Sequence, residues 1–350
     1  MGRPAVGERA DIIVIGGGQS GLAAAYAAKR AGRRAVVLEA AERAGGSWER
    51  YYDSLTLFSP ARYAALPGRP FPGKDERYPR RDEVVAYLRA YADWLGADVR
   101  YGQRAVKVVA DGRFTVVTDA GAEFTADRLI AASGGFGNPR VPELTGLADF
   151  QGEVLHSSAY RLPDRYAGQR VIVVGAGNSA VQIAAELADV ARVSLASRSP
   201  VQWVPQRPLG RDLHWWLTRT GVDSAPIGRW LGKRSMPVID DGRYRAALAS
   251  GNPDRRPMFT RLDGQDVVWA DGEREHVDAL ILATGYRPDL GYLAATGALD
   301  AAGTPLHRAG VSTTVPRLGF VGLEYQHNNA SASLRGVGRD AAYVVKRLCR

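Results

Sequence analysis

Cysteine is almost absent from this sequence, and the one present, Cys349, lies beside the C-terminus. A single cysteine excludes a disulfide framework and an internal pair of redox-active thiols, and it agrees with a reducing cytosol, so we expect a cytoplasmic protein. Long hydrophobic runs are missing as well. The longest, such as Ile12–Ile15, are far too short to span a bilayer, and the first ten residues contain no apolar segment of signal-peptide length. We therefore expect no membrane association.

Histidine is scarce, and motifs of hydrolytic or metal enzymes are missing. The five histidines show no metal-ligand spacing, so we expect no metal site. No G-x-S-x-G turn is present, which argues against a serine hydrolase of the α/β type. Basic residues exceed acidic ones by 46 − 37 = 9, but they are scattered rather than gathered in a run with interleaved aromatics. This pattern predicts attraction of anionic ligands such as dinucleotides and no nucleic-acid partner.

The N-terminal part has the pattern of a mononucleotide-binding half. Residues 11–15 consist of Asp11 and four apolar, β-branched residues, which predicts a buried parallel strand. An alanine-rich helix over 22–31 and a strand over 35–38 follow. Residues 16–21 fit G-x-G-x-x-G, in which the glycines make the tight turn, admit a pyrophosphate and let the helix pack on the strand. The helix N-terminus then faces the phosphates. Glu39, at the end of the next strand, can accept both ribose hydroxyls.

The same pattern returns about one domain later. A strand over 170–174 leads into a glycine turn over 175–180, a helix over 181–187 and a strand over 193–196. The turn reads Gly-Ala-Gly-Asn-Ser-Ala, with alanine in place of the third glycine. The sequence therefore predicts two dinucleotide folds rather than a short-period repeat.

The second unit carries an arginine where the first carries its acidic residue. Glu39 lies 39 − 16 = 23 positions after Gly16, and 175 + 23 = 198 is Arg198. A carboxylate there would repel a 2′-phosphate, whereas an arginine can pair with it in a bidentate way, and Ser197 can add a hydrogen bond. We therefore expect NADPH rather than NADH at the second site. The alternative is an exposed loop arginine in an arginine-rich chain.

The order of elements predicts an α/β protein with two Rossmann-like dinucleotide-binding domains, the NADPH domain inserted into the FAD domain. Between the two glycine motifs we expect a helix over 82–95 and strands over 104–109, 113–118 and 127–132. Further strands are expected over 265–269 and 277–282, and residues 319–350 have the pattern of a strand, a loop and a helix. Residues 201–258 show no regular pattern. The predicted boundaries are 1–160 for the first part of the FAD domain, 161–276 for the insert and 277–350 for the rest.

Further motifs carry a family resemblance. Residues 150–160 match the F-x-G-x-x-x-H-x-x-x-[FY] signature of flavin-containing and N-hydroxylating monooxygenases, and residues 282–286 resemble the L-A-T-G-[FY] segment of that family. Residues 331–338 are similar to small bacterial members, some of them linked with metal and arsenic resistance. Together with the two glycine fingerprints, these motifs cover nearly the whole chain in the expected order.

The resemblance implies a set of cofactor-binding residues. For FAD these are Gly16, Gly18, Gln19, Ser20, Gly21, Glu39, Gly46, Ser47 and Trp48, with Ser133, Gly134 and Leu334 closing on its phosphates and ring. For NADPH they are Gly175, Gly177, Asn178, Ser179, Ala180, Ser197 and Arg198. Thr284 and Gly285 are expected in the hinge between the domains and are counted with the cofactor-binding residues. His156 of the signature has either a structural or a catalytic role.

The implied activity is monooxygenation of a soft nucleophile, a sulfide or an amine, through a C4a-(hydro)peroxyflavin formed from NADPH-reduced FAD and O₂. Phe58 and Asn178 are the candidate catalytic residues; Phe58 stands where larger members place an asparagine over the flavin. Tyr160 stands where Baeyer–Villiger enzymes have tryptophan. Two alternatives stay open: Baeyer–Villiger oxidation, and a reductase or redox flavoprotein that oxygenates nothing. We expect a small-molecule substrate, while the oligomeric state is open, a homodimer being one alternative.

Overall fold

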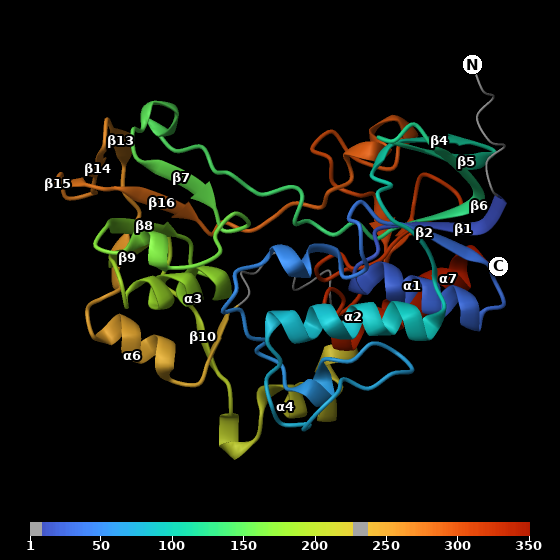
Figure 1. The fold of residues 1–350 in the computed structure, drawn as a ribbon, viewed down its shortest axis with the longest axis horizontal. Coiled ribbons are helices and arrows are strands. Elements are labelled where there is room, and N and C mark those ends of the chain that lie inside the picture. The colour runs from blue at the N-terminus through green and yellow to red at the C-terminus, as the bar shows by residue number, and fades with distance from the viewer. Residues whose placement is uncertain (1–8, 227–236) are drawn as a thin grey trace.

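The computed structural model describes residues 9–226 and 237–350, which form two α/β units side by side (Figure 1). The first unit contains both ends of the described chain, and the second lies between its two parts. Two stretches lie outside the described residues. They are residues 1–8, at the N-terminus, and residues 227–236, which belong to the stretch over 201–258. Within the described ranges, no helix is long and apolar enough to cross a membrane.

The first unit is built on a nine-stranded mixed sheet. β1 pairs in parallel with β2 and β6, β2 with β3, and β6 with β19, while β4 and β5 add an antiparallel hairpin. Helices α1, α2 and α7 cover one face (Figure 1). With 3-10 helices written η, its elements are β1 (Arg9–Ile15), α1 (Gln19–Arg30), β2 (Ala35–Leu38), η1 (Gly46–Arg50), η2 (Ala61–Tyr63), α2 (Arg81–Leu95), β3 (Asp98–Arg100), β4 (Ala105–Asp111), β5 (Arg113–Thr118), β6 (Glu123–Ala131), η7 (Gly291–Thr296), β17 (His307–Arg308), β18 (Val311–Ser312), β19 (Leu318–Phe320) and α7 (Leu334–Leu348).

The second unit is built on a five-stranded parallel sheet in the order β12-β9-β8-β16-β7. A three-stranded antiparallel sheet of β13, β14 and β15 lies beside it. Its elements are η3 (Leu147–Asp149), β7 (Glu153–His156), η4 (Asp164–Tyr166), β8 (Arg170–Val174), α3 (Asn178–Leu187), β9 (Arg192–Ser197), α6 (Arg243–Ala249), β12 (Asp254–Pro257), β13 (Arg261–Asp263), β14 (Asp266–Val268), β15 (Arg274–His276) and β16 (Ala279–Leu282).

The predicted domain boundaries at 160/161 and 276/277 are wrong by one strand each. β7 and β16 both pair within the second sheet, next to each other, although the prediction assigned both to the first domain. The chain therefore crosses to the second unit between β6 and β7 and returns directly after β16. We call the stretch between β6 and β7 and the stretch between β16 and η7 the crossing segments. The local sequence of a short apolar strand does not indicate which sheet the strand joins, because its pairing partners are distant in the sequence.

The described part of the stretch over 201–258 is not irregular, contrary to the sequence-based expectation. Its described part contains β10 (Trp203–Pro205), η5 (Pro208–Gly210), α4 (Leu213–Arg219), η6 (Val222–Ser224) and β11 (Val238–Asp240), followed by α6 and β12 of the second unit. β10 and β11 pair in parallel, and between them α4 lies beneath α2, on the side of the first unit (Figure 1). We call residues 206–226 the strap.

A buried ion network joins the two sheets of the second unit. Arg170, at the start of β8, donates from Nε to Oε1 of Glu275 on β15 at 2.8 Å and from Nη2 to Oε2 at 2.9 Å. Its Nη2 also donates to Oγ of Ser194 at 2.6 Å. Arg192 Nη2 and Trp269 Nε1 donate to the same carboxylate at 2.9 and 3.1 Å. The side chains of Arg170 and Glu275 are each only 10% exposed. This buried pair connects the three-stranded antiparallel sheet to the five-stranded parallel sheet, because Glu275 lies on β15 and Arg170 on β8.

Candidate functional site

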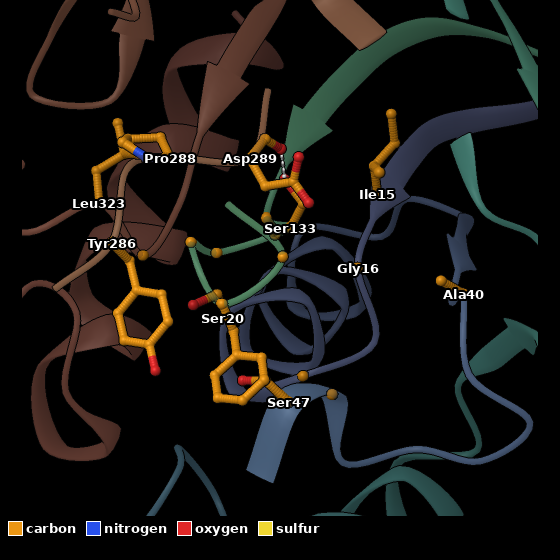
Figure 2. A pocket seen from close by; sticks show the side chains of 18 of the residues that line it. Ile15, Gly16, Ser20, Ala40, Ser47, Ser133, Tyr286, Pro288, Asp289 and Leu323 are labelled. Carbon is orange, nitrogen blue, oxygen red and sulfur yellow. Dashed lines mark hydrogen bonds between the residues drawn. The ribbon is translucent and has the colours of Figure 1, made fainter. Parts of the chain in front are cut away.

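A cavity of about 750 Å³ opens at the carboxyl ends of β1, β2 and β6, where the first unit meets the crossing segments. Figure 2 shows Gly16 and Ser20 of the first glycine loop next to Ser133, with Tyr286, Pro288 and Leu323 on the opposite side. Ten predicted cofactor-binding residues line it: Gly16, Gly18, Gln19, Ser20, Glu39, Gly46, Ser47, Trp48, Ser133 and Gly134. The carboxyl edge of parallel strands is the usual ligand position of such sheets.

The first glycine loop is packed so closely that side chains cannot be added at most of its positions. Gly16 has φ +107°, and a Cβ there would lie 2.6 Å from the Ala132 carbonyl oxygen. A Cβ at Gly21 would lie 1.7 Å from the Gly16 oxygen, which explains why the helix can close on the strand only with glycine. A Cβ at Gly46 would lie 2.7 Å from the Gly18 Cα. The loop is therefore held as a narrow backbone cradle.

The N-terminus of α1 faces this cradle without a side-chain cap. Gly18 is the N-cap residue, no side chain caps the helix, and Gln19 and Ser20 in its first turn line the cavity. Free first-turn N–H groups and the positive end of the helix dipole favour an anion at this position. Gly322 approaches so closely that a Cβ there would lie 2.0 Å from Ser20 Oγ. These features fit the diphosphate of a dinucleotide.

Glu39 presents a fixed carboxylate to the cavity from the end of β2. The residue is 6% exposed. Its Oε2 accepts a hydrogen bond from the Gly17 N–H at 2.6 Å, and its Oε1 accepts one from the Ala41 N–H at 2.8 Å. Each carboxylate oxygen has a further lone pair, so the group can still accept two hydroxyl donors. This donor set fits the ribose of an adenosine, as the sequence predicted.

Side-chain contacts hold the opposite rim of the cavity. Trp48 Nε1 donates to Oε1 of Gln19 at 3.1 Å, and Gln19 Nε2 donates to the Ala332 carbonyl just before α7 at 2.6 Å. Ser133 Oγ donates to the Asp289 carbonyl at 2.6 Å, a bond drawn in Figure 2. Gln19 therefore links η1 and the start of α7 to the glycine loop across the cavity.

Several lining residues were not among the predicted ones. Tyr51, Phe136, Tyr286 and Arg287 line the cavity where the chain crosses between the units. The Phe136 and Tyr286 rings stack at 5.4 Å, and Tyr51 meets Phe136 edge-on at 4.8 Å. Burial raises the pKa of Tyr51, and the nearby Tyr286 raises it further, so its hydroxyl stays protonated. The L-A-T-G-[FY] segment was the available signal, since Tyr286 is its last residue.

Four predicted FAD or hinge residues do not line the cavity. Gly21 serves the packing of α1, and the side chain of Leu334 is buried in the core beneath α1 and α7, so the nearby Ala332 lines the cavity instead. Thr284 and Gly285 directly follow β16, and the lining begins one residue later. Thr284 Oγ1 donates to the Arg140 carbonyl, which ties the two crossing segments together. Thr284 and Gly285 thus lie between the two units, where the hinge was expected, and their contact with a cofactor stays a prediction.

Phe58, a predicted catalytic residue, also lies outside the lining of the cavity. Its ring stacks on His214 of α4 with centroids 6.0 Å apart, and its carbonyl accepts a hydrogen bond from Gln206 Nε2 at 3.0 Å. After η1 the chain turns away from the glycine loop to meet the strap. The structure thus places the Phe58 ring against the strap, and its role in catalysis stays a prediction.

The second glycine loop resembles the first in its backbone geometry. Gly175 has φ +149°, and a Cβ there would lie 2.5 Å from the Ala283 oxygen and 3.0 Å from the Ala180 Cβ. A Cβ at Gly177 would meet no atom within 4 Å, which leaves the approach to the N-terminus of α3 open. Gly177 is the N-cap residue of α3, and no side chain caps this helix either. The half-buried Ser179 lies in its first turn.

Asn178 was predicted both to bind NADPH and to act in catalysis, and its side chain has structural partners. Its Oδ1 accepts a hydrogen bond from the Ile239 N–H at 3.1 Å, and its Nδ2 donates to the Pro237 carbonyl at 3.3 Å. Both polar groups of the amide are thus used to hold the β11 segment beside the glycine loop. These contacts give Asn178 a positioning role, and its part in catalysis stays a prediction.

The end of β9 carries the two residues predicted to select the nicotinamide cofactor. Ser197 is buried at 4% exposure, and its Oγ donates to the Ser199 carbonyl at 2.9 Å. Arg198 is exposed and forms no hydrogen bond or ion pair with any other residue that the structure describes. Its guanidinium is therefore available to an anionic ligand, while the Ser197 hydroxyl can still accept one hydrogen bond.

His156 of the signature lies at the crossing between the units. Its Nδ1 accepts the Ser158 N–H at 3.1 Å, so Nε2 carries the proton and donates to the Gly285 carbonyl at 3.0 Å. Burial lowers the pKa of His156, which keeps the ring neutral. The ring also meets Tyr286 edge-on at 5.0 Å. Of the two roles left open by the sequence, the contacts support the structural one.

Comparison with known proteins gives consistent matches. Residues 13–210 match the family described as pyridine nucleotide-disulphide oxidoreductase. The uncharacterized oxidoreductase CzcO of Bacillus subtilis is 31% identical over 342 residues, covering 97% of this chain and 99% of that protein. A flavin-containing monooxygenase structure from Stenotrophomonas maltophilia has a TM-score of 0.87 at 32% identity, covering 98% of both chains. Indole-3-pyruvate monooxygenase YUCCA1 of rice is 32% identical over 313 residues, covering 79% of this chain and 77% of that one.

Proposed function

We propose that this protein uses FAD, NADPH and O₂ to oxidise a sulfide or an amine. The chain belongs to the pyridine nucleotide-disulphide oxidoreductase family, and it is an oxidoreductase of the flavin-containing monooxygenase type. The observation that carries the proposal is the cavity between the first glycine loop and the crossing segments. The uncapped N-terminus of α1 would bind the phosphates of a dinucleotide there, and Glu39 would bind its ribose. In this arrangement the first unit binds FAD and the inserted unit binds NADPH.

When bound, FAD would accept a hydride from NADPH and activate O₂, so that one oxygen atom reaches the substrate and the other leaves as water. The chain contributes binding and orientation. The first-turn amides of α1 bind the diphosphate, Glu39 accepts the ribose hydroxyls, and Gln19 fixes the Trp48 ring by its hydrogen bond. The aromatic rings at the crossing exclude water from this end of the cavity.

The distribution of cysteine favours oxygenation over electron transfer to a disulfide. Disulfide reductases of this architecture pass electrons to a pair of cysteines, and this chain contains only Cys349. That residue follows α7 and packs against the core of the first unit, and it does not line the cavity. Oxygen and a small-molecule substrate are therefore the proposed electron acceptors.

Product analysis tests the proposal. Purified protein reconstituted with FAD is supplied with NADPH and either thioanisole or a cyclic ketone, and hydrogen peroxide is measured in parallel. We expect methyl phenyl sulfoxide in amounts that exceed any lactone. Lactone as the main product would identify a Baeyer–Villiger enzyme. NADPH oxidation that yields only peroxide, or needs a protein acceptor, would identify a reductase and overturn the proposal.

Arg198 is expected to set the preference for NADPH. A charge-assisted bidentate pair with the 2′-phosphate contributes on the order of 1.5–3 kcal/mol, which corresponds to roughly ten- to hundredfold discrimination against NADH. In Arg198→Ala we expect the KM for NADPH to rise by that factor and the KM for NADH to change less than about twofold. Steady-state kinetics at low and high salt measure both.

Arg261→Ala is the matched control, since Arg261 is another exposed arginine of the second unit. It should leave both KM values unchanged. Equal weakening of NADPH and NADH in Arg198→Ala would show that Arg198 serves the fold of the loop rather than recognition of the phosphate.

A further inference from the structure

The strap contains buried polar side chains at positions where it contacts the first unit. Gln206, Asp212 and Asp223 are 7%, 7% and 4% exposed, and His214 is fully buried. Burying polar and charged groups is costly unless partners compensate for the lost water. The identity of their partners therefore shows what the strap is built to hold.

Asp223 reaches a partner on the helix that begins at the cavity. Arg335, the second residue of α7, donates from Nε to Oδ2 of Asp223 at 2.6 Å and from Nη2 to Oδ1 at 3.0 Å. Asn329 Nδ2 donates to the same Oδ1 at 3.1 Å. Burial alone would raise the pKa of Asp223, but Arg335 lowers it below the ordinary value, so the group is ionised at neutral pH. The pair is bidentate and largely withdrawn from water.

Asp212 forms a second contact of the same kind. Its Oδ2 accepts hydrogen bonds from Tyr78 of the first unit at 2.7 Å and from Gln206 Nε2 at 2.8 Å. Its Oδ1 accepts the N–H of His214 at 2.8 Å and lies 2.9 Å from His214 Nδ1. Burial would raise the pKa of Asp212, but the bonds from His214 and Tyr78 lower it. A carboxylate with four donors is thus shared between the two units.

The ring of His214 fills the space between these two anchors. Phe58 and Tyr63 of the first unit stack on it, with centroids 6.0 and 6.1 Å away. Nδ1 faces the Asp212 carboxylate, so Nδ1 carries the proton, and Nε2 has no hydrogen-bond partner among the described residues. The strap therefore docks on the first unit through a packed aromatic centre flanked by two ionised carboxylates.

We propose that Asp223, Arg335 and Asp212 are positioning residues for hydride transfer, because they clamp the strap of the second unit onto the first unit at the start of α7. The inference rests on the proposed function for the reaction that it serves. The strap directly follows β10, which pairs with β11, and Asn178 of the second glycine loop holds β11. Arg335 lies three residues after Ala332, which lines the cavity. The clamp thus connects the nicotinamide loop with the wall of the flavin cavity and fixes their relative position.

The test compares motion of the strap with separate steps of the reaction. In Asp223→Asn and in Arg335→Met we expect amide hydrogen exchange of residues 206–226 to accelerate at least tenfold, in the apoprotein as well as with FAD bound. The rate of flavin reduction by NADPH in stopped-flow experiments should fall at least tenfold. The dissociation constant of FAD and the rate of flavin reduction by dithionite should change less than twofold, because the clamp does not contact the cradle.

Two further variants keep the result interpretable. Tyr78→Phe removes one hydrogen bond to Asp212 and should show the same changes in smaller measure even if the buried-charge variants fail to fold. Asp241→Asn, the same exchange at an exposed carboxylate of the second unit, should leave every readout unchanged. The double variant, which combines Asp223→Asn with Arg335→Met, should slow flavin reduction by NADPH no more than either single change does, because each single change already breaks the same ion pair.

Three outcomes would overturn the clamp. These are unchanged exchange in the strap, faster exchange with an unchanged rate of reduction, and an equal loss in the NADPH and dithionite reactions. A wild-type protein that fails to oxidise NADPH would instead contradict the proposed function, and the exchange measurement on the apoprotein would still decide whether the clamp exists.

Discussion

Replacing Gly18 by valine is expected to abolish FAD binding while leaving the fold intact. Gly18 has φ −78°, which any residue adopts, and a Cβ there would make ordinary contact with the Gly46 Cα at 3.5 Å. The branched side chain would instead occupy the cavity beside the N-terminus of α1, where the diphosphate must approach. We expect FAD affinity to fall at least about 100-fold, which is roughly 2.7 kcal/mol. Flavin absorbance after reconstitution and titration of the apoprotein measure the loss.

The same change in the second loop provides the matched control. A Cβ at Gly177 meets no atom within 4 Å, and its φ of −93° is also unstrained. Gly177→Val should retain FAD and its reduction by dithionite but lose reduction by NADPH by a similar factor. The unfolding temperature of both apoproteins should match that of the wild type. Loss of FAD in Gly177→Val, or FAD-loaded Gly18→Val, would contradict the assignment of one cofactor to each unit.

Among the substitutions proposed for this protein, we expect Glu275→Leu to cause the largest loss in the free energy of unfolding. The change leaves Arg170 buried with its charge uncompensated, although Ser194 still accepts one of its hydrogen bonds. Breaking a buried ion pair from one side costs about 3–5 kcal/mol. Urea unfolding at pH 7, followed by circular dichroism, measures the change. Glu273→Leu is the control, because Glu273 pairs with Arg256 at the surface and should cost no more than about 1 kcal/mol.

This loss should depend on pH with a definite sign. Burial would raise the pKa of Glu275, but Arg170 lowers it below its ordinary value. A carboxyl group with a lowered pKa in the folded state stabilises the protein at pH values above its unfolded pKa, about 4.3, and loses this contribution as the pH falls through the folded value. The difference between wild type and Glu275→Leu should therefore be full at pH 7 and shrink below about pH 4. A difference that is constant down to pH 3 would assign the effect to packing.

Local sequence was sufficient to locate the two glycine loops and the residues that act through the backbone. The strand, glycine turn and helix of each unit are contiguous, so hydrophobic periodicity and the spacing of glycines predict them directly. Glu39 follows from the same spacing, because the end of β2 lies next to the end of β1 in a parallel sheet. The close approaches at Gly16, Gly21 and Gly46 are the physical reason why these positions carry glycine.

The tertiary structure alone decided which distant segments meet these loops. β7 and β16 belong to the second sheet because β7 pairs with β16 and β16 pairs with β8, which no local sequence pattern predicts. Phe136, Tyr286 and Arg287 reach the cavity because the two crossing segments run side by side. The Phe58 ring stacks on His214 of the strap instead of lining the cavity, and the Asn178 amide holds β11 beside the second glycine loop. The spacing of residues in the sequence specifies a local turn, because all of its contacts are between residues close in the chain. A contact between remote segments depends instead on how the two units pack against each other.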